Sequence, residues 1–116
     1  MNDKETTISQ LKETILDFAR ARGWGAGHNA LNLAVSINLE ASELLEIFQW
    51  CNQVEADQAA RETHREHFLE ELADVMIYCM ELASAYDVDI ASAIEDKMRK
   101  NAIKYPAKQP DTEVIS

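Results

Sequence analysis

The chain has 116 residues, 47% of them hydrophobic, and a formal net charge of −10. This length suits one domain with a modest core, and the hydrophobic fraction is ordinary for a globular protein. Such an acidic surface repels anions, so we expect neither duplex nucleic acid nor a membrane as a partner.

The first predicted element is a helix over about Thr7 to Arg22. Its apolar residues recur at helical spacing; they are Ile8, Leu11, Ile15 and Phe18. Thr6 or Thr7 can cap its start. The segment Gly23–Asn29 contains all three glycines of the chain, and it is expected to be a loop. The tryptophan and the histidine in this loop suggest a mobile wall for a pocket.

A second helix is expected over about Ala30 to Trp50, and apolar residues occupy most of its sides. At 100° per residue, Glu40 points in the same direction as three apolar residues, and Glu43 lies about 60° to one side. The three residues are Leu33, Leu44 and Ile47. Glu40 therefore lies within the apolar face. The polar stretch Cys51–Ala60 is predicted to be a connection.

A third helix is expected over about Arg61 to Tyr86. Glu71 shares its direction with Val75, Tyr78 and Leu82, and Asp74 lies about 60° away. The predicted solvent-facing sector is narrow. It comprises Glu66, Glu70, Glu81 and Ser84.

A short turn over Asp87–Asp89 follows, with Asp89 as a plausible N-cap. It leads into a fourth helix over about Ile90 to Ile103. Pro106 and Pro110 end the regular structure. We expect residues 1–106 to form a single helical domain and residues 107–116 a flexible tail.

The pattern predicts an all-α bundle of four to five helices, because no strand-like alternation occurs. A helix of about 25 residues is roughly 38 Å long, whereas a compact domain of this size has a radius of gyration of about 13 Å. The long apolar helices are therefore expected to pack against a second subunit. We expect a homodimer or a dimer of dimers, that is, a homotetramer.

The cysteines and the first residues indicate a cytoplasmic protein. Cys51 and Cys79 show no CxxC spacing, which predicts reduced thiols. The segment Met1–Thr7 is polar and mixed in charge, unlike a signal peptide. No apolar run approaches the roughly 20 residues that span a bilayer.

Two acidic pairs carry the functional hypothesis. Glu40 and Glu43, and likewise Glu71 and Asp74, stand at positions i and i+3, so each pair shares one side of a helix. Their apolar surroundings make an uncompensated carboxylate costly. Four such groups about 5 Å apart would repel by roughly 3 kcal/mol per pair. A hard cation with oxygen ligands, Mg²⁺ or alternatively Mn²⁺, offsets this repulsion most simply.

Other interpretations of the acids stay open. In one alternative the acidic residues simply face solvent on the helix surface. This alternative fits Glu66, Glu70 and Glu81 better than it fits the two pairs. His64, His67 and Glu71 share a face and form a competing zinc site, although the HExxH order is absent. The Glu-x-x-His pairs of a di-iron bundle are also absent. Three roles stay open for Glu46: a fifth ligand of the metal ion, a base near the site, or an exposed residue without a role in it.

Three segments in order resemble the MazG-like nucleotide pyrophosphohydrolases. The first is Asn32-Leu33 followed by Leu39–Trp50, which resembles the first metal-binding helix of that family. Glu70–Tyr78 resembles the second. Lys97, Asn101 and Lys104-Tyr105-Pro106 resemble the closing motif. The similarity spans about Phe18 to Pro106, and the small dCTP pyrophosphatases resemble the chain most.

The resemblance implies an all-α, Mg²⁺-dependent enzyme that hydrolyses nucleoside triphosphates to the monophosphate and pyrophosphate, for housecleaning or for balancing nucleotide pools. The implied metal ligands and catalytic residues are Glu40, Glu43, Glu71 and Asp74. The implied phosphate and sugar contacts are Lys97, Asn101 and Tyr105. The region around the base is matched by His28, Asn32 and Trp50.

The residues themselves support part of this assignment. Lys97 and Lys104 stand at i and i+7 with Asn101 between them, so they offer charges to phosphates or form a solvated basic helix end. Trp24, His28, Phe48 and Trp50 are candidates to stack on a base. Core packing is the alternative for the three aromatic residues.

A non-catalytic helical module that oligomerises and serves as a binding or regulatory partner is the competing function. It explains the broad apolar faces equally well. It gives no reason for inward-facing acids.

Overall fold

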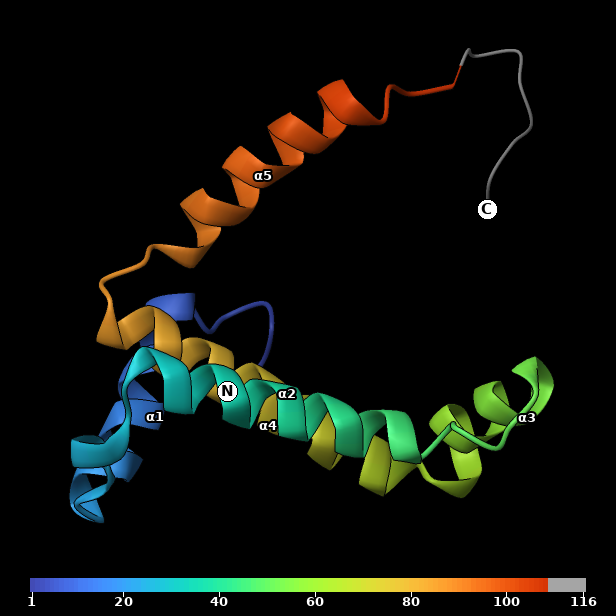
Figure 1. Ribbon diagram of the computed structural model, residues 1–116, viewed down its shortest axis with the longest axis horizontal. Helices are drawn as coiled ribbons and strands as arrows, with labels where there is room; N and C mark the ends of the chain where they lie inside the picture. Colours follow the sequence, from blue (N-terminus) through green and yellow to red (C-terminus); the bar gives the residue numbers. More distant parts are fainter. Residues whose placement is uncertain (109–116) are drawn as a thin grey trace.

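The computed structural model describes residues 1–108, apart from the side chains at positions 26 and 27. Over these residues the chain forms helices and no strands, which confirms the all-α prediction (Figure 1). The expected tail, residues 107–116, lies outside the described residues from 109 onward. The elements in chain order are α1 (Ile8–Ala21), the short 3₁₀ helix η1 (Trp24–Gly27), α2 (Ala30–Glu46), α3 (Gln53–Gln58), the π turn η2 (Ala59–Thr63), α4 (Arg65–Ala85) and α5 (Ile90–Lys104).

Side-chain caps begin the helices at both ends of the molecule, as expected. Thr7 and Gln10 form a reciprocal capping box at the start of α1: each backbone N–H donates to the other side chain, at 2.8 and 3.1 Å. Asp89 accepts a hydrogen bond from the backbone N–H of Ser92 at 2.9 Å and caps α5. This bond satisfies a backbone donor that the first turn leaves unpaired.

Helices α2 and α4 lie side by side and run in opposite directions (Figure 1), and α1 packs against α4. The backbone N–H of Ala30 donates to the hydroxyl of Tyr86 at 2.8 Å, so the start of α2 is tied to the residue that follows α4. Lys12 Nζ donates to the carbonyl oxygen of Val88 at 2.6 Å. The buried apolar residues are Ala19, Leu33, Ile47, Ala59, Met80 and Ala83.

The segment between α2 and α4 differs from the expected one. α2 ends at Glu46 rather than at Trp50, and tight turns follow, in which Phe48 N–H donates to the carbonyl of Leu45 and Cys51 N–H to that of Phe48. The predicted connection contains a short helix, α3, because Asn52 and Glu55 form a capping box. The π turn η2 follows, and α4 begins at Arg65 rather than at about Arg61 as expected.

The expectation that Glu81 faces solvent is wrong. Its residue is only 9% exposed, because α1 and the segment before α2 pack against the end of α4 and cover this side of the helix. Conversely, α2 is less buried in the single chain than its apolar pattern predicts. Its large exposed apolar residues are Leu31, Val35, Leu39 and Leu45.

Helix α5 projects away from the other helices (Figure 1) and contains no buried residue. The molecule is accordingly extended: its radius of gyration is 17.6 Å, against about 13 Å for a compact domain of this size. Within residues 1–108, no helix has both the length and the apolar character needed to cross a bilayer.

Candidate functional site

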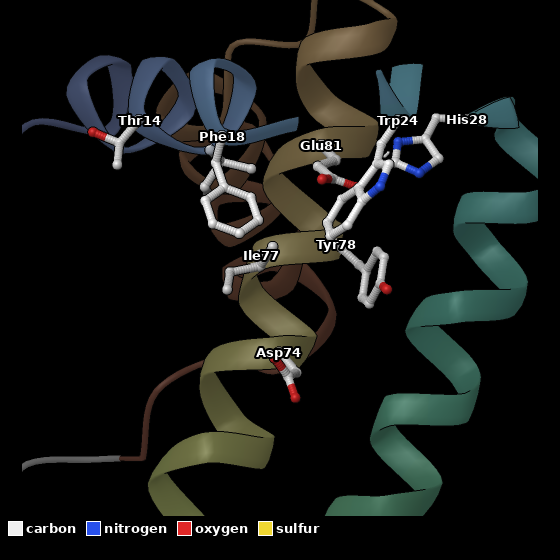
Figure 2. Close-up of a pocket in the computed structure, with 9 residues that line it drawn as sticks. Thr14, Phe18, Trp24, His28, Asp74, Ile77, Tyr78 and Glu81 are labelled. Carbon is white, nitrogen blue, oxygen red and sulfur yellow. Dashed lines mark ion pairs between the residues drawn. The ribbon is translucent and has the colours of Figure 1, made fainter. Parts of the chain in front are cut away.

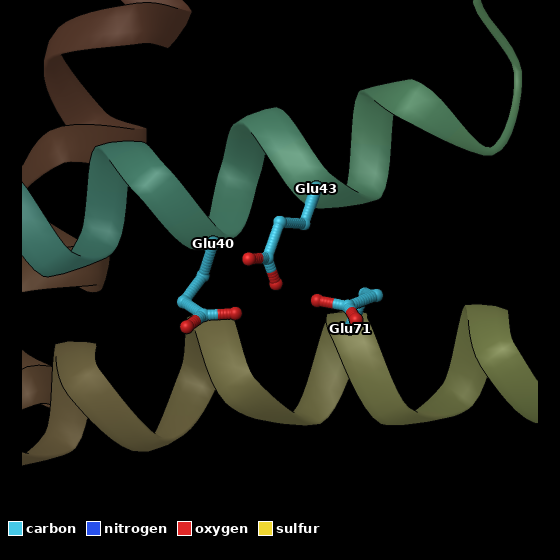
Figure 3. Close-up of side chains that lie close together, drawn as sticks. All are labelled: Glu40, Glu43 and Glu71. Atoms are coloured by element: carbon cyan, nitrogen blue, oxygen red, sulfur yellow. The ribbon is translucent and has the colours of Figure 1, made fainter.

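Three of the predicted acidic residues meet where α2 faces α4. Glu40 and Glu43 project from α2 toward Glu71 on α4 (Figure 3). Each residue offers one carboxylate oxygen, and these oxygens all lie within 4.8 Å of one another. The antiparallel arrangement thus brings together acids that are about thirty positions apart in the sequence.

Two carboxylate oxygens of this cluster have no hydrogen-bond partner among the described residues. They are Oε2 of Glu40 and Oε2 of Glu71, and both are buried. Burial, together with the nearby Glu43, Asp74 and Glu71 carboxylates, raises the pKa of Glu40 to about 7. The pKa of Glu71 is also raised, chiefly by burial and then by Glu43 and Asp74. Such groups favour a proton or a cation.

Asp74, the fourth predicted ligand, lies beside the cluster but outside this set of mutually close oxygens. It is near enough that its charge raises the pKa values of Glu40 and Glu71. It also lines the cavity next to the cluster. Asp74 therefore stands between the acids and the cavity.

The donor set suits a hard divalent cation. All of its candidate ligands are carboxylate oxygens, which Mg²⁺ and Mn²⁺ prefer. The two unpartnered buried oxygens of Glu40 and Glu71 are the atoms whose desolvation a cation would offset. The residues present therefore fit such an ion.

The competing interpretations find less support. His67 Nε2 lies 3.3 Å from Oε1 of Glu71, one turn away on α4, but His64 does not join a three-ligand group within residues 1–108. His64 instead precedes the first residue of α4. Glu46 is exposed at the end of α2.

A cavity of about 420 Å³ lies beside the acidic cluster, between α1 and α4. Figure 2 shows aromatic side chains around it, with Asp74 at one end and Glu81 and His28 at the other. Phe18 and Trp24 meet edge to face with ring centroids 5.6 Å apart. The pKa of Tyr78 is raised by burial and then by nearby carboxylates, Glu40 first. The cavity is thus aromatic with acidic ends.

The predicted base-binding residues separate in the structure. Trp24 and His28 line the cavity. Asn32 lies in the first turn of α2, where its backbone N–H donates to the Asn29 side chain at 2.9 Å. Trp50 follows the far end of α2 and is 88% exposed. Phe48 packs edge to face on Phe68, which supports a packing role.

The predicted phosphate contacts are not brought to the acidic cluster within the single chain. Lys97, Asn101 and Lys104 lie on α5, which projects away (Figure 1), and Tyr105 follows it. The side chains of Lys97 and Lys104 are exposed. Any contact of α5 with a ligand at the cluster therefore needs a second copy or a different position of the helix.

Sequence reasoning did not assign six of the residues that line the cavity to the site: Thr14, Ile15, Phe18, Ile77, Tyr78 and Glu81. Phe18 and Tyr78 were assigned only to apolar helix faces. Glu81 stands seven residues after Asp74, so the two point in almost the same direction. That spacing is the signal that identifies Glu81.

Comparison with known proteins agrees with this geometry. The model of the MazG-like family matches residues 35–113. A pyrophosphatase from Archaeoglobus fulgidus has a similar structure, with a TM-score of 0.81 and 36% identity, and the match covers 92% of this chain and 99% of that one.

Curated relatives agree as well. They include dCTP pyrophosphatase 1 from Rattus norvegicus and from Mus musculus, each 36% identical over 103 residues. These matches cover 88% of the chain and 61% of each relative, so the chain spans less than two thirds of their length. The family match and the shared structure together show that the chain belongs to the MazG-like family.

Proposed function

We propose that this protein is a Mg²⁺-dependent nucleoside triphosphate pyrophosphohydrolase, which converts a ribo- or deoxynucleotide to its monophosphate and pyrophosphate. The observation that carries the proposal is the carboxylate cluster of Glu40, Glu43 and Glu71 beside an aromatic cavity of about 420 Å³. Relatives named dCTP pyrophosphatase 1 favour dCTP or a modified nucleotide as substrate.

Glu40, Glu43 and Glu71 would hold the cation, with Asp74 at the edge toward the cavity. The chemistry that Mg²⁺, or alternatively Mn²⁺, would supply there is compensation of charge on the phosphoryl oxygens and a lower pKa for the attacking water. The same cation would compensate the buried oxygens of Glu40 and Glu71.

The side chains supply the remaining parts of the reaction. Because Glu43 is exposed at the cluster, we assign its carboxylate to accept a proton from the attacking water. Glu46, also exposed, is the alternative base. The water oxygen bonds to the α-phosphorus, and the bond to the bridging oxygen breaks to release pyrophosphate. Trp24 and Phe18 provide apolar surface for the base.

A second copy of the chain is part of the proposal. α5 exposes Ile94, Met98 and Ile103, the last at 84%, and an isolated helix of this kind gains little stability without packing. We therefore expect a homodimer or homotetramer. Sedimentation equilibrium at micromolar concentration should give a mass of two or four chains; a monomer mass would contradict the proposed assembly.

The basic residues of α5 would then reach the phosphates of a nucleotide bound in the assembly. The Lys97→Ala variant is expected to raise KM for the triphosphate about tenfold, because an ion-assisted hydrogen bond contributes roughly 1.5–3 kcal/mol. Steady-state pyrophosphate release measures this effect. Lys4→Ala removes an exposed lysine that is not part of α5 and serves as the control. Unchanged kcat and KM in Lys97→Ala would reject the phosphate role.

The function itself is tested by a pyrophosphate-release screen of standard and modified nucleotides with Mg²⁺. We expect release from at least one deoxynucleoside triphosphate and none after chelation with EDTA. No release from any nucleotide, with the protein folded and assembled, would favour the non-catalytic helical module.

A further inference from the structure

Glu81 is a buried carboxylate that the proposed reaction does not use. Its side chain is 10% exposed, and it lines the aromatic cavity at the end opposite Asp74 (Figure 2). Oε2 of Glu81 is buried and accepts no hydrogen bond from the described residues. A carboxylate in such a position is costly unless a ligand donates to it.

His28 is the charged or polar neighbour of this carboxylate. Its Nδ1 lies 3.5 Å from Oε2 of Glu81, too long for a good hydrogen bond. His28 lies in the segment between η1 and α2, whereas Glu81 lies on α4, and both residues line the cavity. The contact with His28 therefore orients the Glu81 carboxylate but does not give Oε2 a hydrogen-bond donor.

Glu81 lies at a distance from the acidic cluster that suits the base of a nucleotide whose phosphates are at the cluster. Asp74 and Glu81 are seven residues apart on α4, so they share a direction and are separated by about 10 Å along the helix. Tyr78 lies between them on the cavity wall. A nucleotide with its phosphates at the cluster would extend its base past Tyr78 toward Glu81.

We propose that Glu81 determines base specificity by accepting a hydrogen bond from the exocyclic amino group of the base. This inference rests on the proposed function for the placement of the phosphates. A cytosine base offers its N4 amino group as a donor, whereas uracil presents the O4 acceptor at the same position. With uracil, the O4 oxygen and the Glu81 carboxylate oxygen would face each other in a largely buried site, and neither could donate a hydrogen bond. A site of this kind strongly rejects the uracil nucleotide.

The test compares dCTP with dUTP, which differ at this edge of the base. The wild-type chain is expected to favour dCTP in kcat/KM by at least about tenfold. Glu81→Gln keeps the side-chain size but adds an NH₂ donor that pairs with O4. The dCTP-to-dUTP ratio should therefore fall about 10- to 100-fold in this variant. Glu66→Gln, an exposed residue on the same helix, is the matched control and should leave the ratio unchanged.

Two results would overturn the assignment. One is a wild-type chain that does not discriminate between dCTP and dUTP, a measurement that needs no variant. The other is a Glu81→Gln variant that is folded by circular dichroism and loses activity equally on both nucleotides, which would mean that Glu81 only places the histidine segment.

Failure of the proposed function is distinguishable from failure of this inference. If the wild type releases no pyrophosphate from any nucleotide, calorimetric binding of dCMP and dUMP still tests Glu81. Tighter binding of dCMP that is lost in Glu81→Gln would support the inference. Equal affinities for the two monophosphates would reject it.

Discussion

The Glu40→Gln and Glu71→Gln variants are expected to lose more than about a hundredfold in the rate of Mg²⁺-dependent pyrophosphate release while keeping their helical content. Residues that merely orient metal ligands contribute roughly 10- to 100-fold, and these two carboxylates would bind the ion directly. An amide keeps the size of the side chain but removes the charge that attracts a hard cation. The loss should therefore appear in turnover rather than in folding.

The burial of these side chains explains why the effect should be specific. Oε2 of each residue is buried and unpartnered within the described chain, so a neutral amide relieves repulsion inside the cluster even as it removes a ligand. Steady-state kinetics with Mg²⁺ varied at saturating nucleotide gives the activity, and far-ultraviolet circular dichroism gives the helical content. Glu66→Gln, which removes an exposed charge from α4, should behave as the wild type. Full activity in either cluster variant would remove the metal role.

The acidic cluster was predictable because local spacing and burial pointed to the same answer. Glu40 and Glu71 each fall on an apolar helix face, and each has a second acid one turn away. The sequence does not show that α2 and α4 pair side by side in opposite directions. That packing brings Glu43 and Glu71 together and leaves Asp74 nearer the cavity.

Glu81 was misassigned because a helical wheel shows direction but not what covers each side. Glu81 points in almost the same direction from α4 as Asp74 does, at the border between the apolar and polar sides of the helix. The side it occupies is covered by α1 and by His28, elements that are more than fifty positions away in the sequence. Long-range packing of this kind overrides a single-helix pattern.

Helices α3 and α5 show two other limits of prediction from sequence. Asn52 and Glu55 carry a capping-box signal, which a search for caps rather than apolar periodicity finds. The direction of α5 could not be predicted for another reason. Its apolar residues Ile94, Met98 and Ile103 are exposed and none of its residues is buried among residues 1–108, so apolar packing there does not fix its direction. A second copy is the partner that we propose for it.

The thermal stability of the metal-free chain is expected to fall as pH rises from about 4.5 to 7. Folding raises the pKa of Glu40 from 4.5 to about 7 and that of Glu71 in the same direction. Between the two pKa values the folded state therefore holds protons that the unfolded state has released. Raising the pH removes those protons and leaves clustered charge, so the free energy of unfolding decreases until pH exceeds the folded-state pKa.

Added Mg²⁺ should reverse this loss, and more so at pH 8 than at pH 5, because the ion binds the deprotonated carboxylates. At a hundredfold excess over Kd the gain is about 2.7 kcal/mol, or roughly 10 °C in Tm for a domain of this size. Melts with EDTA, with Mg²⁺ and with KCl at matched ionic strength separate binding from screening.

The Glu40→Gln variant isolates the cluster from the general effect of the net charge of −10. It should have a shallower pH dependence than the wild type and a smaller Mg²⁺ shift, because one coupled proton and one ligand are gone together. A wild-type Tm at pH 8 that is the same with and without Mg²⁺ would contradict a cation site at these residues. A pH dependence identical in wild type and variant would show that the titration belongs to the surface instead.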